Sequence, residues 1–249
     1  MQPTFTRGSM PRAMPQSIRK VLTLIIAGIK AILRRIKHWL KGDPDSFLRD
    51  VSGVIHVGAN SGQEREKYRN LGLQVIWVEP IPEVFAELER NIRGFSNQRA
   101  YQALVTDADG QEYRFHISNN DGLSSSILEL KQHRDIWPDV DYTTSISLKS
   151  ITLASLLERE RINPRDYQAL IMDTQGSELL VLQGSGRILE NFEYIKTEVP
   201  DFESYEGCCQ LVDISAFMKK HGYIEFSRNK FASRAAGGDY FDIVYRRMA

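Results

Sequence analysis

The chain has 249 residues, of which 42% are hydrophobic, enough to bury one α/β core of catalytic size together with an appendage. Its net charge of zero hides an asymmetry: nine of the 32 basic residues and none of the 32 acidic ones precede Asp43, so residues 43–249 carry −9. An acidic body argues against a nucleic-acid partner, and the adjacent Cys208 and Cys209 argue against a cysteine metal cage and favour a reducing compartment.

Residues 1–42 form the first of two expected regions, an irregular start followed by a basic amphipathic helix. Between Ser17 and Lys41 the apolar residues recur at alternate spacings of four and three, which places them on one helix face. The longest uncharged run, 21–29, is far shorter than the roughly 20 residues that span a bilayer. We expect residues 17–41 to lie on a membrane surface, or to pack on the domain or on a second subunit of a homo-oligomer. The protein would then be cytoplasmic or peripheral on the membrane. A mitochondrial presequence has the same basic, acid-free amphipathic pattern and is a further alternative.

The second region, 43–249, begins with a glycine turn between two apolar strands. A buried-type strand at 54–57 precedes a polar helix at 63–71, and a second strand at 75–78 ends at Glu79. This order predicts half of a mononucleotide-binding β-α-β unit. Gly58 permits a sharp turn close to a ligand, and Gly62 opens the helix whose free N–H groups face the same crevice. Glu79 follows the turn by about 20 residues, the spacing of a carboxylate that binds ribose hydroxyls.

The remaining elements continue the alternation of strands and helices. In chain order we expect a helix at 82–92, strands at 101–106 and 112–118, and a polar loop at 119–126 that suits a mobile lid. A strand at 145–148, a helix from Thr152, a strand at 169–172, a helix that starts near Ser177 and a strand at 194–199 follow. The chain ends with a helix at 212–221 and strands at 223–226 and 240–245. The alternation predicts an α/β fold with a doubly wound, mostly parallel sheet. The last two strands lack a crossover helix and therefore imply an antiparallel edge strand.

The glycine turn departs from the dinucleotide fingerprint. G-x-G-x-x-G would place glycine at positions 60 and 63, where this chain has Asn60 and Gln63. The pyrophosphate of NAD depends on that close helix N-terminus, whereas a ligand without phosphate, such as S-adenosylmethionine, does not. A methyl-donor site is therefore favoured over an NAD-type enzyme. A non-catalytic scaffold that acts through the N-terminal helix is a further alternative.

Five stretches in a fixed order resemble the FkbM family of S-adenosylmethionine-dependent methyltransferases: 55–63 (IHVGANSGQ), 78–82 (VEPIP), 119–126 (NNDGLSSS), 151–157 (ITLASLL) and 171–182 (IMDTQGSELLVL). The resemblance covers residues 50–200. It implies a Rossmann-like class I methyltransferase with a seven-stranded sheet. It also implies methyl transfer to a hydroxyl of a small-molecule or glycan acceptor, such as a lipid-linked sugar or a secondary metabolite.

The resemblance also suggests where the cofactor binds. Gly58, Asn60 and Gly62 would lie along its methionine and ribose, with His56 at the methionine end, where many members have an acid. Asp107 would lie near adenine, although an aspartate in Asp-Ala-Asp-Gly fits a turn equally well.

Two carboxylates follow strands that should be neighbours. Asp173 and Glu198 end strands about 5 Å apart at the sheet edge where ligands bind. Methyl transfer is an in-line displacement in which the protein positions the acceptor and helps to remove its proton, and burial near other carboxylates raises a pKa into a useful range. We expect Asp173 to be the base or acceptor orienter, with Glu198 beside it. The competing interpretations are a cap ahead of the next helix for Asp173 and an ordinary strand-end carboxylate for Glu198. No spacing predicts a metal site.

Overall fold

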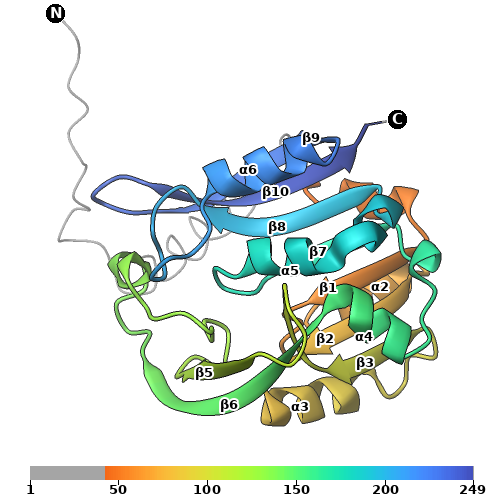
Figure 1. The fold of residues 1–249 in the computed structure, drawn as a ribbon, viewed down its shortest axis with the longest axis horizontal. Coiled ribbons are helices and arrows are strands. Elements are labelled where there is room, and N and C mark those ends of the chain that lie inside the picture. Colours follow the sequence, from red (N-terminus) through yellow and green to blue (C-terminus); the bar gives the residue numbers. More distant parts are fainter. Residues whose placement is uncertain (1–42, 249) are drawn as a thin grey trace, which may run out of the picture. The chain divides into compact units, whose positions relative to one another are not determined.

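The computed structural model describes residues 43–248, and the expected helix at 17–41 lies outside this range. A seven-stranded sheet has the order β3-β2-β1-β7-β8-β10-β9 (Figure 1). Its strands are β1 (Gly53–Val57), β2 (Gln74–Glu79), β3 (Gln98–Gln102), β7 (Ala169–Met172), β8 (Tyr194–Pro200), β9 (Tyr223–Ser233) and β10 (Asp239–Arg247).

The sheet is mostly parallel, as predicted. β3, β2, β1, β7 and β8 pair in parallel, and the apolar runs of β1, β2 and β7 are those of strands buried on both faces. β10 is antiparallel to both β8 and β9, so the antiparallel strand lies one place inside the edge, between β8 and the edge strand β9. The predicted α/β class and the β9–β10 hairpin are confirmed.

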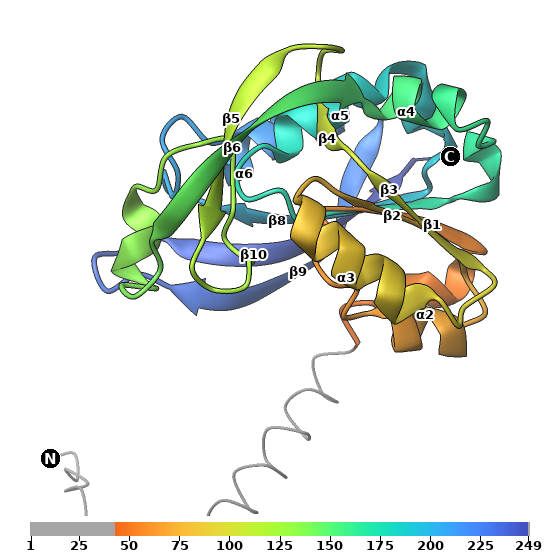
Figure 2. The same ribbon diagram turned by 90° about the horizontal axis from the view of Figure 1, so that it is seen from below.

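Helices cover both faces of this sheet (Figures 1 and 2). α4 (Leu153–Arg159), α5 (Glu178–Ser185) and α6 (Leu211–Lys220) pack on one face, and η1 (Ser46–Asp50), α2 (Arg65–Asn70) and α3 (Pro82–Ile92) pack on the other. β1 divides accordingly, because Ile55 and Val57 enter the first core while Val54 enters the second. Short 3-10 turns complete the connections: η2 (Gln132–Asp135), η3 (Pro164–Asp166) and η4 (Gly186–Asn191). Within residues 43–248 no helix has the length and apolar character needed to cross a membrane.

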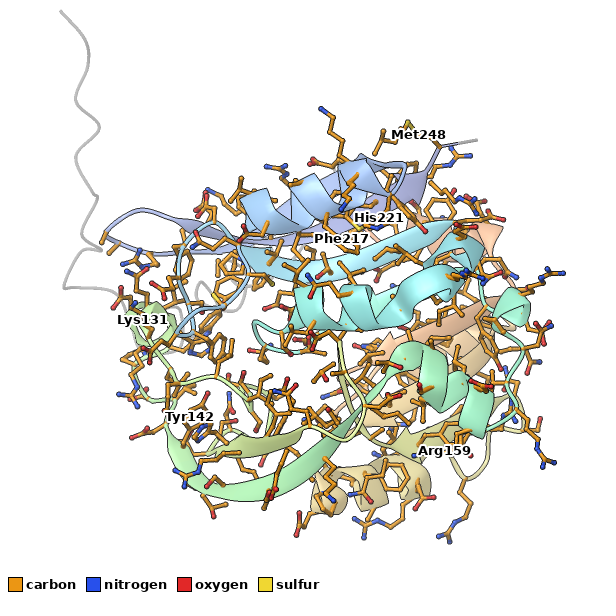
Figure 3. The ribbon with its side chains drawn as sticks, in the orientation of Figure 1. Lys131, Tyr142, Arg159, Phe217, His221 and Met248 are labelled. Atoms are coloured by element: carbon orange, nitrogen blue, oxygen red, sulfur yellow. The ribbon has the colours of Figure 1, made fainter. Side chains whose placement is uncertain are left out.

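α6 begins and ends as its sequence indicates. Gln210 and Asp213 form a reciprocal capping box at its start. At its end the ring of His221 stacks on Phe217 at 4.1 Å between centroids, and His221 Nδ1 lies 2.8 Å from the Phe217 carbonyl oxygen (Figure 3). His221 is therefore a helix-end residue.

A second sheet of three strands has the order β4-β6-β5 and arches beside the first (Figure 2). It comprises β4 (Leu104–Thr106), β5 (Glu112–Ser118) and β6 (Tyr142–Thr152). The expectation of one strand at 101–106 is wrong, because β3 pairs with β2 in the large sheet while β4 pairs with β6 in the small one. The chain changes sheets at Ala103, whose N–H donates to the Glu79 carbonyl oxygen at 3.3 Å. The strand expected at 145–148 is longer than predicted.

The helix after the glycine turn is shorter than the predicted 63–71. α2 begins at Arg65, whose N–H donates to the Gly62 carbonyl oxygen at 3.2 Å. Gly62 has φ +73° and belongs to the preceding turn, and a Cβ there would lie 2.7 Å from Leu88 Cδ1. Gly62 therefore shapes the turn against α3 and does not open the helix.

Candidate active site

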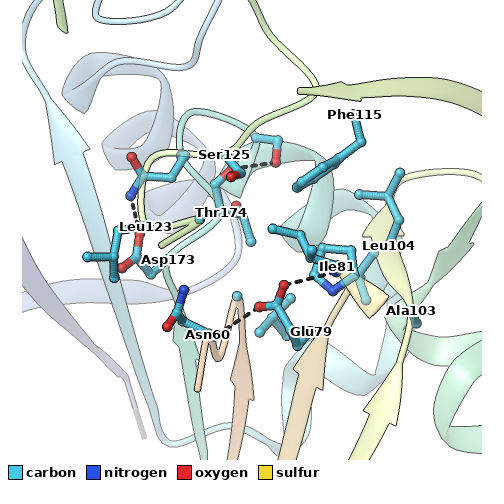
Figure 4. A pocket seen from close by; sticks show the side chains of 17 residues that line it. Asn60, Glu79, Ile81, Ala103, Leu104, Phe115, Leu123, Ser125, Asp173 and Thr174 are labelled. Carbon is cyan, nitrogen blue, oxygen red and sulfur yellow. Dashed lines mark hydrogen bonds between the residues drawn. The ribbon is translucent and has the colours of Figure 1, made fainter. Parts of the chain in front are cut away.

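A pocket lies at the C-terminal edge of β1, β2 and β7, and β4, β5 and the loop at 119–126 complete its walls (Figure 4). The space between its walls is about 550 Å³, open solvent at the mouth included. One end is apolar, and the other carries convergent polar groups. The apolar end is formed by Ile81, Leu104 and Phe115, and the polar end includes Asn60, Glu79 and Asp173.

Gly58 brings β1 and β7 together at the floor of the pocket. Its φ is +79°, and a Cβ at this position would lie 1.8 Å from the Asp173 carbonyl oxygen. The Gly58 N–H donates to the Val78 carbonyl oxygen at 2.9 Å, and the Asp173 N–H donates to the Val57 carbonyl oxygen at 3.0 Å. Both the left-handed backbone and the close approach require glycine.

Glu79 ends β2 with its carboxylate inside the pocket. Its two oxygens accept the N–H groups of Asn60 at 2.9 Å and Ile81 at 3.0 Å. Burial raises the pKa of Glu79 to about 7, against the effect of these two hydrogen bonds and with a contribution from the charge of Asp173. A carboxylate has about four acceptor positions, so Glu79 keeps capacity to accept two vicinal hydroxyls, as a ribose requires.

Asp173 and Glu198 are placed together, as predicted from their strands. Met172 on β7 pairs with Thr197 on β8, so the two acids that follow emerge side by side. Burial raises the pKa of Asp173 to about 7; the Gln175 amide opposes this rise, and nearby acids, Glu178 first, add to it. Burial and then the charge of Asp173 raise the pKa of Glu198 well above its usual range. Asp173 lines the pocket, whereas Glu198 stands beside it outside the lining.

Glu178 supports the turn that follows Asp173, a role that its sequence position did not indicate. Its side chain is 1% exposed, and Oε1 accepts the N–H groups of Thr174 at 2.9 Å and Gly176 at 3.1 Å. The turn that it holds presents Thr174 to the pocket. Thr174 Oγ1 is buried and has no partner within residues 43–248. A buried hydroxyl without a hydrogen-bond partner is uncommon in folded proteins.

Hydrogen bonds connect the loop at 119–126, the expected mobile lid, to the turns that follow β1 and β7. Asn60 Nδ2 donates to the Asp121 carbonyl oxygen at 3.0 Å, and Ser126 Oγ donates to the Gln175 carbonyl oxygen at 2.8 Å. Ser126 is 1% exposed, whereas Leu123 at the pocket mouth is 49% exposed. Ser126 thus connects the loop to the turn after β7, and Leu123 is exposed at the pocket mouth.

Three of the sequence-predicted cofactor residues do not line the pocket. His56 is 6% exposed on the opposite face of the sheet, where it stacks on Trp77 at 5.2 Å and lies 3.1 Å from the Tyr68 hydroxyl. Burial lowers its pKa. Asp107 is exposed beyond β4, and Gly62 packs against α3. The structure therefore gathers Gly58, Asn60, Glu79 and Asp173, with Glu198 adjoining.

The chain is similar to known methyltransferases. The sequence profile of the methyltransferase FkbM domain matches residues 56–225. A curated relative, the 2-O-methyltransferase NoeI of Sinorhizobium fredii, is 28% identical over 162 residues, which are 62% of this chain and 65% of NoeI, just under two thirds of its length.

Solved structures give more distant likenesses. Magnesium protoporphyrin IX methyltransferase from Synechocystis, with bound S-adenosylmethionine, aligns with a TM-score of 0.47 at 10% identity, over 90% of this chain and 82% of that one. Precorrin-6y C5,15-methyltransferase from Geobacter metallireducens aligns at 0.44 and 12% identity, over 80% and 81%. The family match covers more than half of the chain, which therefore belongs to the FkbM family of methyltransferases.

Proposed function

We propose that the protein is an S-adenosylmethionine-dependent O-methyltransferase that acts on a hydroxyl of a small-molecule or glycan acceptor. The observation that carries this proposal is the presence of two carboxylates, Glu79 and Asp173, in one pocket beside the Gly58 turn. The first suits the ribose hydroxyls and the second suits the acceptor. The similarity to a relative named as a 2-O-methyltransferase supports a hydroxyl acceptor.

The residues present fit the cofactor. Glu79 would bind the ribose, the apolar end formed by Ile81, Leu104 and Phe115 would take the adenine, and the turn at Gly58 and Asn60 would approach the methionine part. The unpartnered Thr174 hydroxyl gives the polar end a further hydrogen-bonding group. When bound, the cofactor supplies a methyl group on a positively charged sulfur.

Asp173 is then the proton acceptor. The Asp173 carboxylate would take the proton of the acceptor hydroxyl, and the bound cofactor would supply the methyl group that replaces this proton on the oxygen. A pKa of about 7 suits this role, because such a base is partly ionised at neutral pH and still holds a proton firmly. Glu198 alongside shares the negative charge, so the two carboxyl groups titrate as a pair.

Residues 17–41 would bring this domain to a membrane surface. The proposal rests on the basic, amphipathic pattern of that segment and on the acidic remainder of the chain. It predicts that full-length protein floats with liposomes containing anionic lipid and that a chain lacking residues 1–42 does not. Equal recovery of both would reject the membrane role and would favour a helix that packs on the domain or on a second subunit.

Calorimetry and a methylation screen test the enzyme proposal together. Wild type should bind S-adenosylmethionine, and Glu79→Ala should bind it at least about tenfold more weakly, because a hydrogen bond to a charged group contributes about 1.5–3 kcal/mol. Labelled cofactor incubated with cell extract should then transfer its label to a hydroxyl-bearing product. Equal binding by Glu79→Ala would refute the site, and cofactor binding without any labelled product would favour a non-catalytic scaffold.

A further inference from the structure

A chain of hydrogen bonds leads from the protein core to Asp173. Gln175 Nε2 donates to Asp173 Oδ1 at 2.5 Å, and Gln175 Oε1 accepts the Tyr205 hydroxyl at 2.6 Å. Tyr205 is 1% exposed, and its hydroxyl also reaches the Ser124 carbonyl oxygen at 3.4 Å. A buried phenol thus reaches the pocket carboxylate through one amide.

The backbone of Gln175 is held in a conformation that a side chain disfavours. Its φ is +51°, and the next residue, Gly176, has φ +100°. The turn is maintained by the Glu178 carboxylate, which accepts the Gly176 N–H, and by Ser126 Oγ, which donates to the Gln175 carbonyl oxygen. Left-handed backbone at a non-glycine residue costs about 1–3 kcal/mol and persists where the surroundings enforce it, most often at functional sites. A glycine at position 175 would avoid this backbone strain. The presence of glutamine therefore indicates that its side chain has a role.

We propose that Gln175 is a positioning residue: its amide, oriented by Tyr205, aligns the Asp173 carboxylate and favours its ionised form. This inference rests on the proposed role of Asp173 as the base. It deepens that role by naming the groups that set the direction of the carboxylate.

The direction of the amide follows from Tyr205. Burial raises the pKa of Tyr205 well above 10, so its hydroxyl keeps its proton and acts as a donor. The Gln175 oxygen must therefore face Tyr205, and the NH₂ group must face Asp173. A flipped amide would set an oxygen against the Asp173 carboxylate and leave the phenol only the Ser124 carbonyl oxygen, at 3.4 Å, in place of the Gln175 oxygen at 2.6 Å. Because Gln175 engages only Oδ1, Asp173 can present its other oxygen to the acceptor hydroxyl.

Carbon-13 NMR of aspartate side chains tests the proposal without knowledge of the acceptor. In full-length protein with labelled aspartate carboxyl carbons, the resonance lost in Asp173→Asn identifies Asp173, and its pH titration gives the pKa. Gln175→Gly should raise this pKa by about one unit, because a hydrogen bond to the charged form is lost and about 1.4 kcal/mol corresponds to one unit. Glycine also accepts the left-handed backbone, so the turn should persist.

Tyr205→Phe provides a second, independent perturbation. It keeps the ring but frees the amide to rotate, so the pKa of Asp173 should rise by less than in Gln175→Gly. Gln111→Ala, at an exposed glutamine outside the pocket, is the matched control and should leave the titration unchanged. An unchanged Asp173 titration in both variants, with melting temperatures close to wild type, would overturn the positioning role. Full methyl transfer by Asp173→Asn would instead refute the base itself, so the two failures are distinguishable.

Discussion

Replacement of Asp173 by asparagine removes one charge while it keeps the shape of the side chain and an oxygen that can accept the Gln175 amide. In the folded protein the pKa of Asp173 is raised from 3.8 to about 7, chiefly by burial. At 1.36 kcal/mol per unit, holding the ionised form in the pocket costs about 4 kcal/mol. The side chain is partly open to pocket water, which screens the charge and reduces the expected cost to about 2 kcal/mol.

The sign of the pH dependence follows from the raised pKa. In the unfolded chain Asp173 ionises near pH 4, whereas the folded protein retains the proton until about pH 7. Wild type therefore loses stability as the pH rises through this interval. Asp173→Asn has no such pH-dependent loss. Its unfolding free energy should therefore exceed that of the wild type by a small amount at about pH 5 and by about 2 kcal/mol at about pH 8.

Urea unfolding at these two pH values measures the difference, and labelled cofactor measures turnover, which should fall by about 10²- to 10⁴-fold. Asp139→Asn, at an exposed aspartate outside the pocket, is the control and should change neither quantity. A stability difference that is the same at both pH values would refute the burial argument. Turnover equal to wild type would refute the catalytic role.

Other substitutions test the remaining parts of the pocket. Gly58→Ala should lower the melting temperature markedly, because its Cβ would meet the Asp173 carbonyl oxygen at 1.8 Å; an unchanged melting temperature would contradict the close approach of β1 and β7. Thr174→Val should stabilise the ligand-free protein by about 1–3 kcal/mol in urea, since it removes an unpartnered buried hydroxyl, and should weaken cofactor binding in calorimetry. No gain in stability would show that the hydroxyl is satisfied. Phe115→Leu keeps the apolar wall but removes the ring, so Kd for S-adenosylmethionine should rise about fivefold; equal affinity would place the adenine elsewhere.

The order of elements was readable from the sequence because apolar periodicity and strand length are local properties. The run at 169–172 is a central strand, and Thr152 caps α4 by accepting the Ser155 N–H at 3.1 Å. The change of sheet at Ala103 was not readable, because the run from Tyr101 to Thr106 contains no glycine or proline and its partners lie elsewhere in the chain.

The site was predictable where topology alone positions a side chain. Glu79 ends β2 and Asp173 follows β7, the two strands that flank β1, and parallel strands end at one edge of a sheet. His56 sits on a strand whose neighbours Ile55 and Val57 face one core, so strict alternation turns its side chain to the other face. The contacts of Gln175 with Asp173 and Tyr205 could not be predicted from the sequence. Tyr205 lies 30 residues away, and glutamine is not a residue type that indicates a left-handed backbone.

The change of sheet at Ala103 makes the pocket a joint between two sheets, since Glu79 belongs to the large sheet and Leu104 and Phe115 to the small one. A ligand that contacts both walls therefore links the two sheets. At a concentration of 100 times Kd, binding to the folded state alone adds about 2.7 kcal/mol of stability, and part of that gain must fasten the small sheet to the large. Release of the demethylated cofactor must then weaken the contact between the two sheets. Tighter cofactor binding would therefore slow product release and lower the turnover rate.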